Sequence, residues 1–327
     1  MSRERTRYVY LGPEGTFAEQ ALRTLIGVPL GAPARGPARA GGRLDPVPSV
    51  PEALDEVRSG QADAALVPLE NSIGGSEGVT LDEMAGGAPL MIIREVVLAV
   101  NFVLAARAPV PLAELRTIGA HPNAARQCRG WLRDHAPGAV VMEVLSNGAA
   151  ALAAADATYD AAICAPVGAQ RNRLTVVADA IADHKDSLTR FALIARPGPP
   201  PEPTGDDVTS LAVYISADRV GALLAVLTEL AVRGVNLTRI ESRPTGERLG
   251  RYAFFLDCTG HVAQARMGEA LQGLHRVCAE VKFLGSYPRA RLPGGPAGPV
   301  TPAPIGTSDE DFAESQAWLD RLRADGS

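Results

Sequence analysis

Cysteine, aromatic residues and long apolar runs are all scarce in this sequence of 327 residues. The four cysteines, Cys128, Cys164, Cys258 and Cys278, include no CxxC pair. The spacing typical of a zinc site is therefore absent, and the sequence predicts no metal site. A chain of this length needs no disulfide framework in order to fold, so we expect reduced thiols.

Positive charge is also in short supply. The chain has 32 Lys and Arg against 37 Asp and Glu, a net charge of -5, whereas a general nucleic-acid binder carries a basic face. The longest apolar stretch, residues 89–106, is interrupted by Arg94, Glu95 and Asn101, so no membrane span is expected there. The first seven residues lead into a short strand and not into the apolar core of a signal peptide. We expect a cytoplasmic protein with neither nucleic-acid nor membrane partners.

The remaining composition is that of a soluble globular protein, with 46% hydrophobic and 21% charged residues. The length predicts about two domains. Residues 196–209, rich in Pro and Gly, are typical of a linker. The predicted organisation is therefore a first domain at 7–195, the linker, a second domain at 210–288 and a tail at 289–327.

Two further segments have biased composition. Residues 31–43 (GAPARGPARAGGR) predict a flexible surface insertion, and residues 289–306 a disordered stretch of the tail. Beyond it, Thr307 and Glu310 are spaced as a capping box for a short helix that places Phe312, Leu319 and Leu322 on one side.

The first domain alternates short apolar runs with Ala-rich helical stretches. This alternation predicts an α/β fold with a largely parallel sheet, in which ligands bind beyond the carboxyl ends of the strands. The predicted strands are Tyr8–Leu11, Ala64–Pro68, Glu95–Leu104, Val140–Glu143, Ala161–Ala165 and Phe191–Ala195. The predicted helices are Phe17–Leu25, Val50–Ser59, Ala124–Asp134 and Ala149–Thr158.

Four strand ends carry polar residues that suit ligand binding. They are LGPEGTF (11–17), Glu70-Asn71-Ser72, GAHPNAARQC (119–128) and DSLTRF (186–191). Each also has a structural interpretation: a tight turn with a cap, a helix cap, a structural His121, and a surface ion pair of Arg190.

Taken in order, these stretches are more specific than any one alone. Through GPEGTFAEQA, VPLENSIGGS, HPNAARQC and LTRF, followed by GALL and ESRP, the sequence resembles prephenate dehydratases with a C-terminal ACT domain, from about Tyr8 to Tyr287. It departs from the family at Ser187, where Asn is common, at Asn123 and Gly74, where Gln and Glu are frequent, and at Ser146-Asn147-Gly148, where Ser-Thr-Ala is usual.

The resemblance implies a lyase that converts prephenate to phenylpyruvate in phenylalanine biosynthesis, without a cofactor because aromatisation supplies the driving force. Thr189 would then hydrogen-bond the leaving hydroxyl, and Arg190 would pair with a carboxylate. The implied catalytic residues are Thr189, Arg190, Glu70, Asn71 and Ser72. The implied substrate-binding residues are Gly15, Thr16, Phe17, His121, Asn123, Gln127, Ser146 and Phe191. They would line a cleft between two subdomains, as in periplasmic binding proteins.

The second domain reads as strand, helix, two strands, helix and strand, the order of a ferredoxin-like α+β sandwich. The predicted elements are Leu211–Ser216, Val220–Arg233, Leu237–Arg243, Arg251–Cys258, Ala263–Ala279 and Val281–Tyr287. The resemblance makes this an ACT domain that binds phenylalanine as feedback effector and pairs in a homodimer or homotetramer. The implied effector-binding residues are Gly221, Ala222, Leu223, Leu224, Asn236, Leu237, Glu241, Ser242, Arg243 and Pro244.

Two other functions fit the same residues. One is an arogenate dehydratase, which forms phenylalanine directly. The other is a non-catalytic amino-acid sensor, which the presence of Thr189 and Arg190 disfavours.

Overall fold

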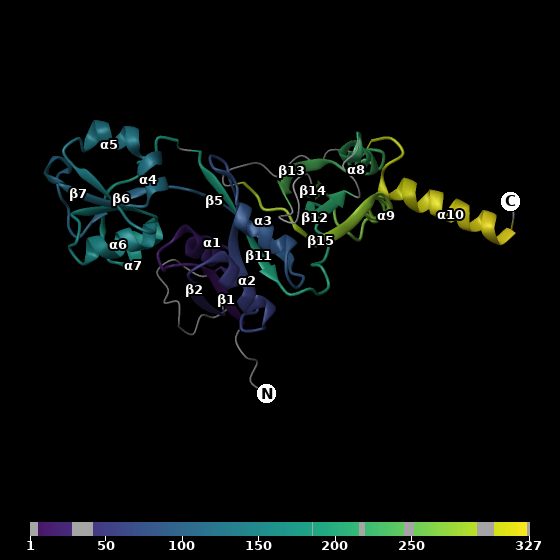
Figure 1. Ribbon diagram of the computed structural model, residues 1–327, viewed down its shortest axis with the longest axis horizontal. Coiled ribbons are helices and arrows are strands. Elements are labelled where there is room, and N and C mark those ends of the chain that lie inside the picture. The colour runs from purple at the N-terminus through teal and green to yellow at the C-terminus, as the bar shows by residue number, and fades with distance from the viewer. Residues whose placement is uncertain are drawn as a thin grey trace. The chain divides into compact units, whose positions relative to one another are not determined.

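The computed structural model describes residues 6–27, 42–184, 186–215, 220–244, 252–292 and 304–325 (Figure 1). The predicted insertion at 31–43 lies outside the described residues up to position 41, as does the tail from 293 to 303. The chain forms two compact units, residues 1–80 with 96–196, and residues 81–95 with 197–327. Among the described residues, no helix has the length and apolar character needed to cross a membrane.

The first unit forms two sheets, and it shares the elements α3 and β5 of the first sheet with the second unit. Sheet one has the strand order β2-β1-β3-β11-β5, with β4 beside β3. Its strands and helices are β1 (Arg7–Leu11), α1 (Phe17–Ile26), β2 (Arg43–Val47), α2 (Val50–Arg58), β3 (Ala64–Asn71), β4 (Gly75–Ser76), α3 (Gly78–Ala85), β5 (Met91–Ala99) and β11 (Leu188–Ala195). Strand β1 runs parallel to β2 and β3, whereas β11 runs antiparallel to β3 because it returns from the second sheet.

Sheet two has the order β10-β6-β9-β7-β8. Its elements are β6 (Val103–Ala106), the short 3-10 helix η1 (Leu112–Glu114), β7 (Thr117–Ala120), α4 (Pro122–Gln127), α5 (Arg129–His135), β8 (Val140–Glu143), α6 (Asn147–Ala155), β9 (Ala161–Cys164), α7 (Pro166–Arg171) and β10 (Thr175–Ala178). Strand β7 is parallel to β8 and β9, but β6 is antiparallel to β9 and β10. Both sheets are therefore mixed, which corrects the prediction of a largely parallel sheet.

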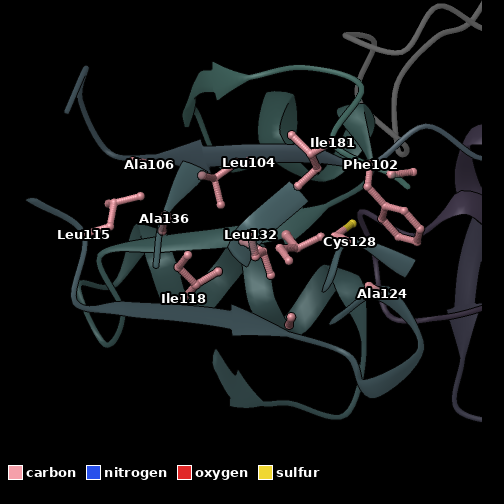
Figure 2. Close-up of a cluster of buried hydrophobic side chains, with 14 of the residues drawn as sticks. Phe102, Leu104, Ala106, Leu115, Ile118, Ala124, Cys128, Leu132, Ala136 and Ile181 are labelled. Atoms are coloured by element: carbon pink, nitrogen blue, oxygen red, sulfur yellow. The ribbon is translucent and has the colours of Figure 1, made fainter. Parts of the chain in front are cut away.

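A compact apolar core holds the second sheet to its helices. Phe102, Leu104, Ile118 and Leu132 are buried in one cluster, shown in Figure 2, with Phe17 of α1 packed against it. Burying each such large side chain stabilises the fold by roughly 1.5–3 kcal/mol. We call the first sheet with its helices the first subdomain, and the second sheet with its helices the second subdomain. The rings of Phe17 and Phe102 meet edge to face with their centroids 5.3 Å apart, so the start of α1 packs on the second subdomain.

Several element boundaries differ from the sequence prediction. The predicted strand Glu95–Leu104 is two strands, β5 and β6, because the chain passes from one sheet to the other at Val100–Phe102. The predicted helix Ala124–Asp134 is two helices that meet at Cys128, whose φ of -111° and ψ of 9° are not helical. Strand β2, hidden by Pro46, was not predicted, and it lies at a sheet edge, where proline is tolerated.

The second unit contains the expected βαββαβ sandwich. Its elements are β12 (Asp207–Ile215), α8 (Ala222–Ala231), β13 (Leu237–Pro244), β14 (Tyr252–Thr259), α9 (Ala265–Val277) and β15 (Cys278–Pro288). The sheet order is β13-β14-β12-β15, antiparallel throughout. Helix α8 begins later than predicted because Gly221 adopts φ +81°, which a helix cannot continue.

The tail carries a helix, α10 (Asp309–Asp325), with a different cap from the predicted one. Ser308 Oγ accepts from Asp311 N at 3.1 Å, and Asp311 Oδ2 accepts from Ser308 N at 2.9 Å. Thr307 is turned the other way, donating to Pro304 O at 2.7 Å. The prediction that Thr307 and Glu310 form the capping box was therefore wrong.

All four cysteines are free and buried. Burial raises the pKa of Cys128, Cys164 and Cys258 to about 12. Their thiols are accordingly core side chains and not nucleophiles.

Candidate active site

Thr189 and Asn71 face each other at the polar edge of the first sheet. In the antiparallel pairing of β11 with β3, Thr189 lies opposite Asn71 and Arg190 opposite Glu70. The register shifts between Arg190 and Phe191, so a bulge separates this edge from the regular ladder behind it. Such bulges re-aim side chains next to functional sites. The two predicted motifs thus form one constellation.

The hydrogen bond between these side chains has a fixed direction. Asn71 Oδ1 accepts from the backbone N–H groups of Ile73 and Gly74, both at 2.9 Å. The amide nitrogen must then face Thr189, and it donates to Thr189 Oγ1 at 2.8 Å. A hydroxyl that accepts here keeps its own proton for another acceptor. Thr189 is therefore held as a donor, and it is 8% exposed.

Opposite charges flank this pair. A guanidinium nitrogen of Arg190 lies 3.8 Å from Glu70 Oε2, longer than a direct hydrogen bond. Ser72 ties the two strands together: its backbone N–H donates to Leu188 O at 2.9 Å, and its Oγ accepts from Leu188 N at 3.0 Å. The hydroxyl of Ser72, a predicted catalytic residue, is thus hydrogen-bonded to backbone. Arg190 places a positive charge at the same edge of the sheet.

The GPEGTF turn closes against the second subdomain. Gly15 has φ +84° and lies so near α7 that an added Cβ would be 3.0 Å from Gly168 Cα. An added Cβ at Gly148, the second residue of α6, would be 2.3 Å from Glu14 O. Only glycine fits these positions. The amino ends of α1 and α6 therefore lie next to each other. This brings together Gly15 and Ser146, two of the predicted substrate-binding residues.

A buried ion cluster that the sequence reasoning missed holds this junction. Glu19 is fully buried and accepts from Gly15 N at 2.7 Å, from Arg23 Nε at 2.8 Å and from Arg171 Nη1 at 2.8 Å. Arg171 also pairs with Glu14. Because Arg171 belongs to α7 and Glu19 to α1, the cluster spans both subdomains. The four-residue spacing of Glu19 and Arg23 was the only sequence signal for it.

The other predicted substrate-binding residues lie at helix ends, apart from Phe191. His121 caps α4 by accepting from Asn123 N at 3.2 Å, and Ser146 caps α6 by accepting from Ala149 N at 3.0 Å. Asn123 Oδ1 accepts from Arg126 at 2.8 Å. Gln127 Oε1 is a buried acceptor without a hydrogen-bond partner among the described residues. Thr16 caps α1, and Phe191 is a buried core residue of β11.

The predicted effector residues lie on α8 and β13 of the second unit. Gly221 precedes α8, with open space within 4 Å of an added Cβ, and Leu224 is 66% exposed. Asn236 O accepts from Thr259 N at 2.8 Å. At the end of β13, Arg243 is not open: its guanidinium makes a two-point ion pair with Asp82.

The chain is similar to known proteins over most of its length. The family model "Prephenate dehydratase" matches residues 8–199, and the ACT domain model matches residues 209–276. A prephenate dehydratase of Amycolatopsis methanolica is 44% identical over 315 residues, covering 96% of this chain and 97% of that protein. The crystal structure of a prephenate dehydratase in complex with L-Phe from Arthrobacter aurescens is 43% identical, with a TM-score of 0.85, covering 98% of this chain and 100% of that one.

A more distant solved structure, a quorum-quenching acylase named GqqA, is 26% identical with a TM-score of 0.73, covering 86% of this chain and 97% of that one. A shared fold therefore does not by itself fix the reaction. The two matching family models, together with the high identity over nearly the full length, do fix the family. The chain belongs to the prephenate dehydratase family, with an ACT domain following the dehydratase domain.

Proposed function

We propose that this chain is a carbon–oxygen lyase that converts prephenate to phenylpyruvate, carbon dioxide and water. The observation that carries the proposal is the fixed donor character of Thr189, set by the hydrogen bond from Asn71. A site that must assist a departing hydroxyl needs a positioned donor at that oxygen.

The reaction breaks two bonds of the substrate. The bond from the ring to its carboxylate breaks, and its electron pair moves into the ring as carbon dioxide leaves. The bond from the ring to the hydroxyl breaks at the opposite carbon, and the hydroxyl takes up a proton to leave as water. Because the product ring is aromatic, the chemistry needs neither an electron acceptor nor a metal.

Thr189 assists by donating a hydrogen bond to the leaving oxygen. Its hydroxyl is too weak an acid to give up its proton outright, so the final proton comes from water. Arg190 supplies the positive charge that a substrate with two carboxylates requires, and a guanidinium binds a carboxylate with two parallel hydrogen bonds. Glu70, Asn71 and Ser72 shape the same edge of the sheet.

The remaining proposed contacts to the substrate come from the start of α1, from Phe191 of β11, and from helices α4 and α6 of the second subdomain. Gly15, which precedes Thr16 and Phe17 in the chain, lies beside the start of α6, which Ser146 caps. Backbone N–H groups at such helix starts favour anions. His121, Asn123 and Gln127, at α4, complete the proposed pocket with Phe191.

Phenylalanine is the proposed feedback effector, bound at the start of α8 and along β13. The named residues are Gly221, Ala222, Leu223, Leu224, Asn236, Leu237, Glu241, Ser242, Arg243 and Pro244. We also infer a cytoplasmic homodimer or homotetramer. In support, three large apolar side chains of the ACT domain are exposed: Leu224 of α8 at 66%, Val232 at the C-cap of α8 at 62%, and Ile240 of β13 at 44%. Light scattering of the purified chain tests the oligomeric state.

The test of the activity is a product assay with two substrates. The purified chain is incubated with prephenate or with arogenate, and the aromatic product is identified. Formation of phenylpyruvate from prephenate, unchanged by a chelator, supports the proposal. Phenylalanine formed from arogenate alone would make the chain an arogenate dehydratase, and no product from either would favour the amino-acid sensor.

A further inference from the structure

The segment 81–95 belongs to a different unit from the chain on either side of it. Residues up to Thr80 and from Val96 onward are part of the first unit, whereas Leu81–Glu95 pack with the ACT unit. The segment contains the second half of α3 and the first half of β5 (Figure 1). Each of these elements is therefore continuous between the two units.

Arg243 of β13, in the ACT sheet, forms an ion pair with Asp82 of this segment. Its Nη2 donates to Asp82 Oδ2 at 2.6 Å and its Nε to Asp82 Oδ1 at 3.1 Å, the two-point geometry in which arginine binds a carboxylate. The hydrogen bond to Asp82 raises the pKa of Arg243. Arg243 is part of the ESRP stretch proposed above to bind the effector.

Two cations of the ACT sheet lie at the end of helix α3. It has no basic residue in its last turn, and Asp82 places a negative charge near the helix end that prefers positive charge. The ACT sheet supplies what the helix lacks, since Arg243 neutralises Asp82 and Lys282 Nζ of β15 donates to Ala85 O. The end of α3 is thus held by two strands of the ACT sheet.

The start of β5 is held as closely. An added Cβ at Gly285 of β15 would lie 2.2 Å from Ile92 O, so the two backbones are in direct contact. Glu95 Oε1 accepts from Ala290 N at 2.7 Å. A movement of the ACT sheet therefore carries the start of β5 with it.

The two ends of the segment lead to the two partners of the active-site hydrogen bond. Before it, Thr80 Oγ1 donates to Pro68 O at 2.6 Å and Glu77 N to Leu69 O at 3.0 Å, next to Asn71 in β3. After it, β5 is the neighbour of β11, which carries Thr189. Val100 N then donates to Ser187 O at 2.7 Å.

We propose that the Arg243–Asp82 ion pair is the positioning contact through which an effector bound at the ACT domain acts on the Asn71–Thr189 pair. The inference rests on the proposed function, because it takes phenylalanine as effector and dehydration as readout. An effector that shifts β13 moves Arg243 together with Asp82, which Arg243 holds, and α3 transmits this movement to the strand end that holds Asn71. The coupling free energy transmitted through this contact cannot exceed the free energy of interaction between Arg243 and Asp82.

Asp82→Asn tests this contact because it keeps the shape of the side chain and removes its charge. The variant should keep the basal kcat and should bind phenylalanine in calorimetry as the parent does. Its residual rate at saturating phenylalanine should rise by about 2- to 5-fold, the equilibrium equivalent of an exposed ion pair. Asp82→Glu, which keeps the charge, should retain most of the inhibition.

Asp134→Asn is the matched control. Asp134 makes the same two-point contact with Arg133, at 2.8 and 3.2 Å, on α5 of the first unit. This control should be inhibited like the parent. Inhibition of Asp82→Asn equal to that of the parent would overturn the proposed link alone. Loss of phenylalanine binding in Asp82→Asn would make the pair part of the effector site and also overturn it. A parent chain without any phenylalanine response would overturn the effector assignment and this inference together.

Discussion

The side-chain amide of Asn71 donates to the hydroxyl oxygen of Thr189 at 2.8 Å, across 118 positions of sequence. Because two backbone N–H groups fix the amide orientation, the bond also fixes which way the threonine proton points. One amide thereby converts an ordinary hydroxyl into a positioned donor.

Asn71→Asp should reverse that hydrogen bond. The carboxylate still accepts from Ile73 N and Gly74 N, but it cannot donate, so Thr189 donates to it instead. The Thr189 proton is then no longer available for a hydrogen bond to the substrate. We expect kcat to fall by about 10²-fold with a smaller change in KM, as for the loss of a transition-state contact. Steady-state kinetics with prephenate measures both. A variant with the parent's kcat would show that the Asn71 donor does not orient Thr189.

Gly148→Ala should loosen the junction between the two subdomains. Its Cβ would meet Glu14 O at 2.3 Å, so the GPEGTF turn must shift, at a cost of about 1–3 kcal/mol in the free energy of unfolding. Gly268→Ala is the matched control, since Gly268 lies inside α9 with open space around it. That control should stabilise the chain by up to about 1 kcal/mol. Urea unfolding compares the two, and equal stability of both variants would contradict the close packing at Gly148.

Gly221→Val should abolish the response to phenylalanine and keep the basal rate. A branched side chain at φ +81° strains the start of α8 and occupies the open space where the effector would approach. Gly205→Val is the control, because Gly205 has φ +88° and equally open surroundings but precedes β12. Calorimetry reports phenylalanine binding, and a product assay reports the rate. Undiminished binding by Gly221→Val would place the effector site elsewhere.

The polar residues at the strand ends could be predicted from the sequence, whereas the pairing of the strands could not. Glu70-Asn71-Ser72 and Thr189-Arg190 were recognisable as polar residues at the ends of apolar runs, because alternation of buried and polar residues is local. Their register was not, since pairing of β3 with β11 and the bulge after Arg190 depend on contacts more than a hundred residues apart. The break between β5 and β6 was hidden because Asn101 is the one polar residue in the apolar run 96–106, which serves two sheets.

The buried ion cluster at Glu19 and the ion pair between Arg243 and Asp82 could not be predicted from the sequence either. Glu19 and Arg23 have the spacing of an ordinary surface pair, yet both are fully buried, and Arg171 joins them from the other subdomain. Arg243 was expected only at the effector. Its pairing with Asp82 follows from how the ACT sheet packs on residues 81–95, which no local pattern encodes.

The kcat of Thr189 variants with prephenate tests the central claim most directly, namely that the threonine hydroxyl assists the leaving group. Thr189→Ala removes the hydroxyl and should lower kcat by about 10²-fold or more, whereas Thr189→Ser keeps it and should retain far more activity. Thermal unfolding of each variant controls for folding. Full activity in Thr189→Ala would contradict the account and assign the leaving hydroxyl to another residue.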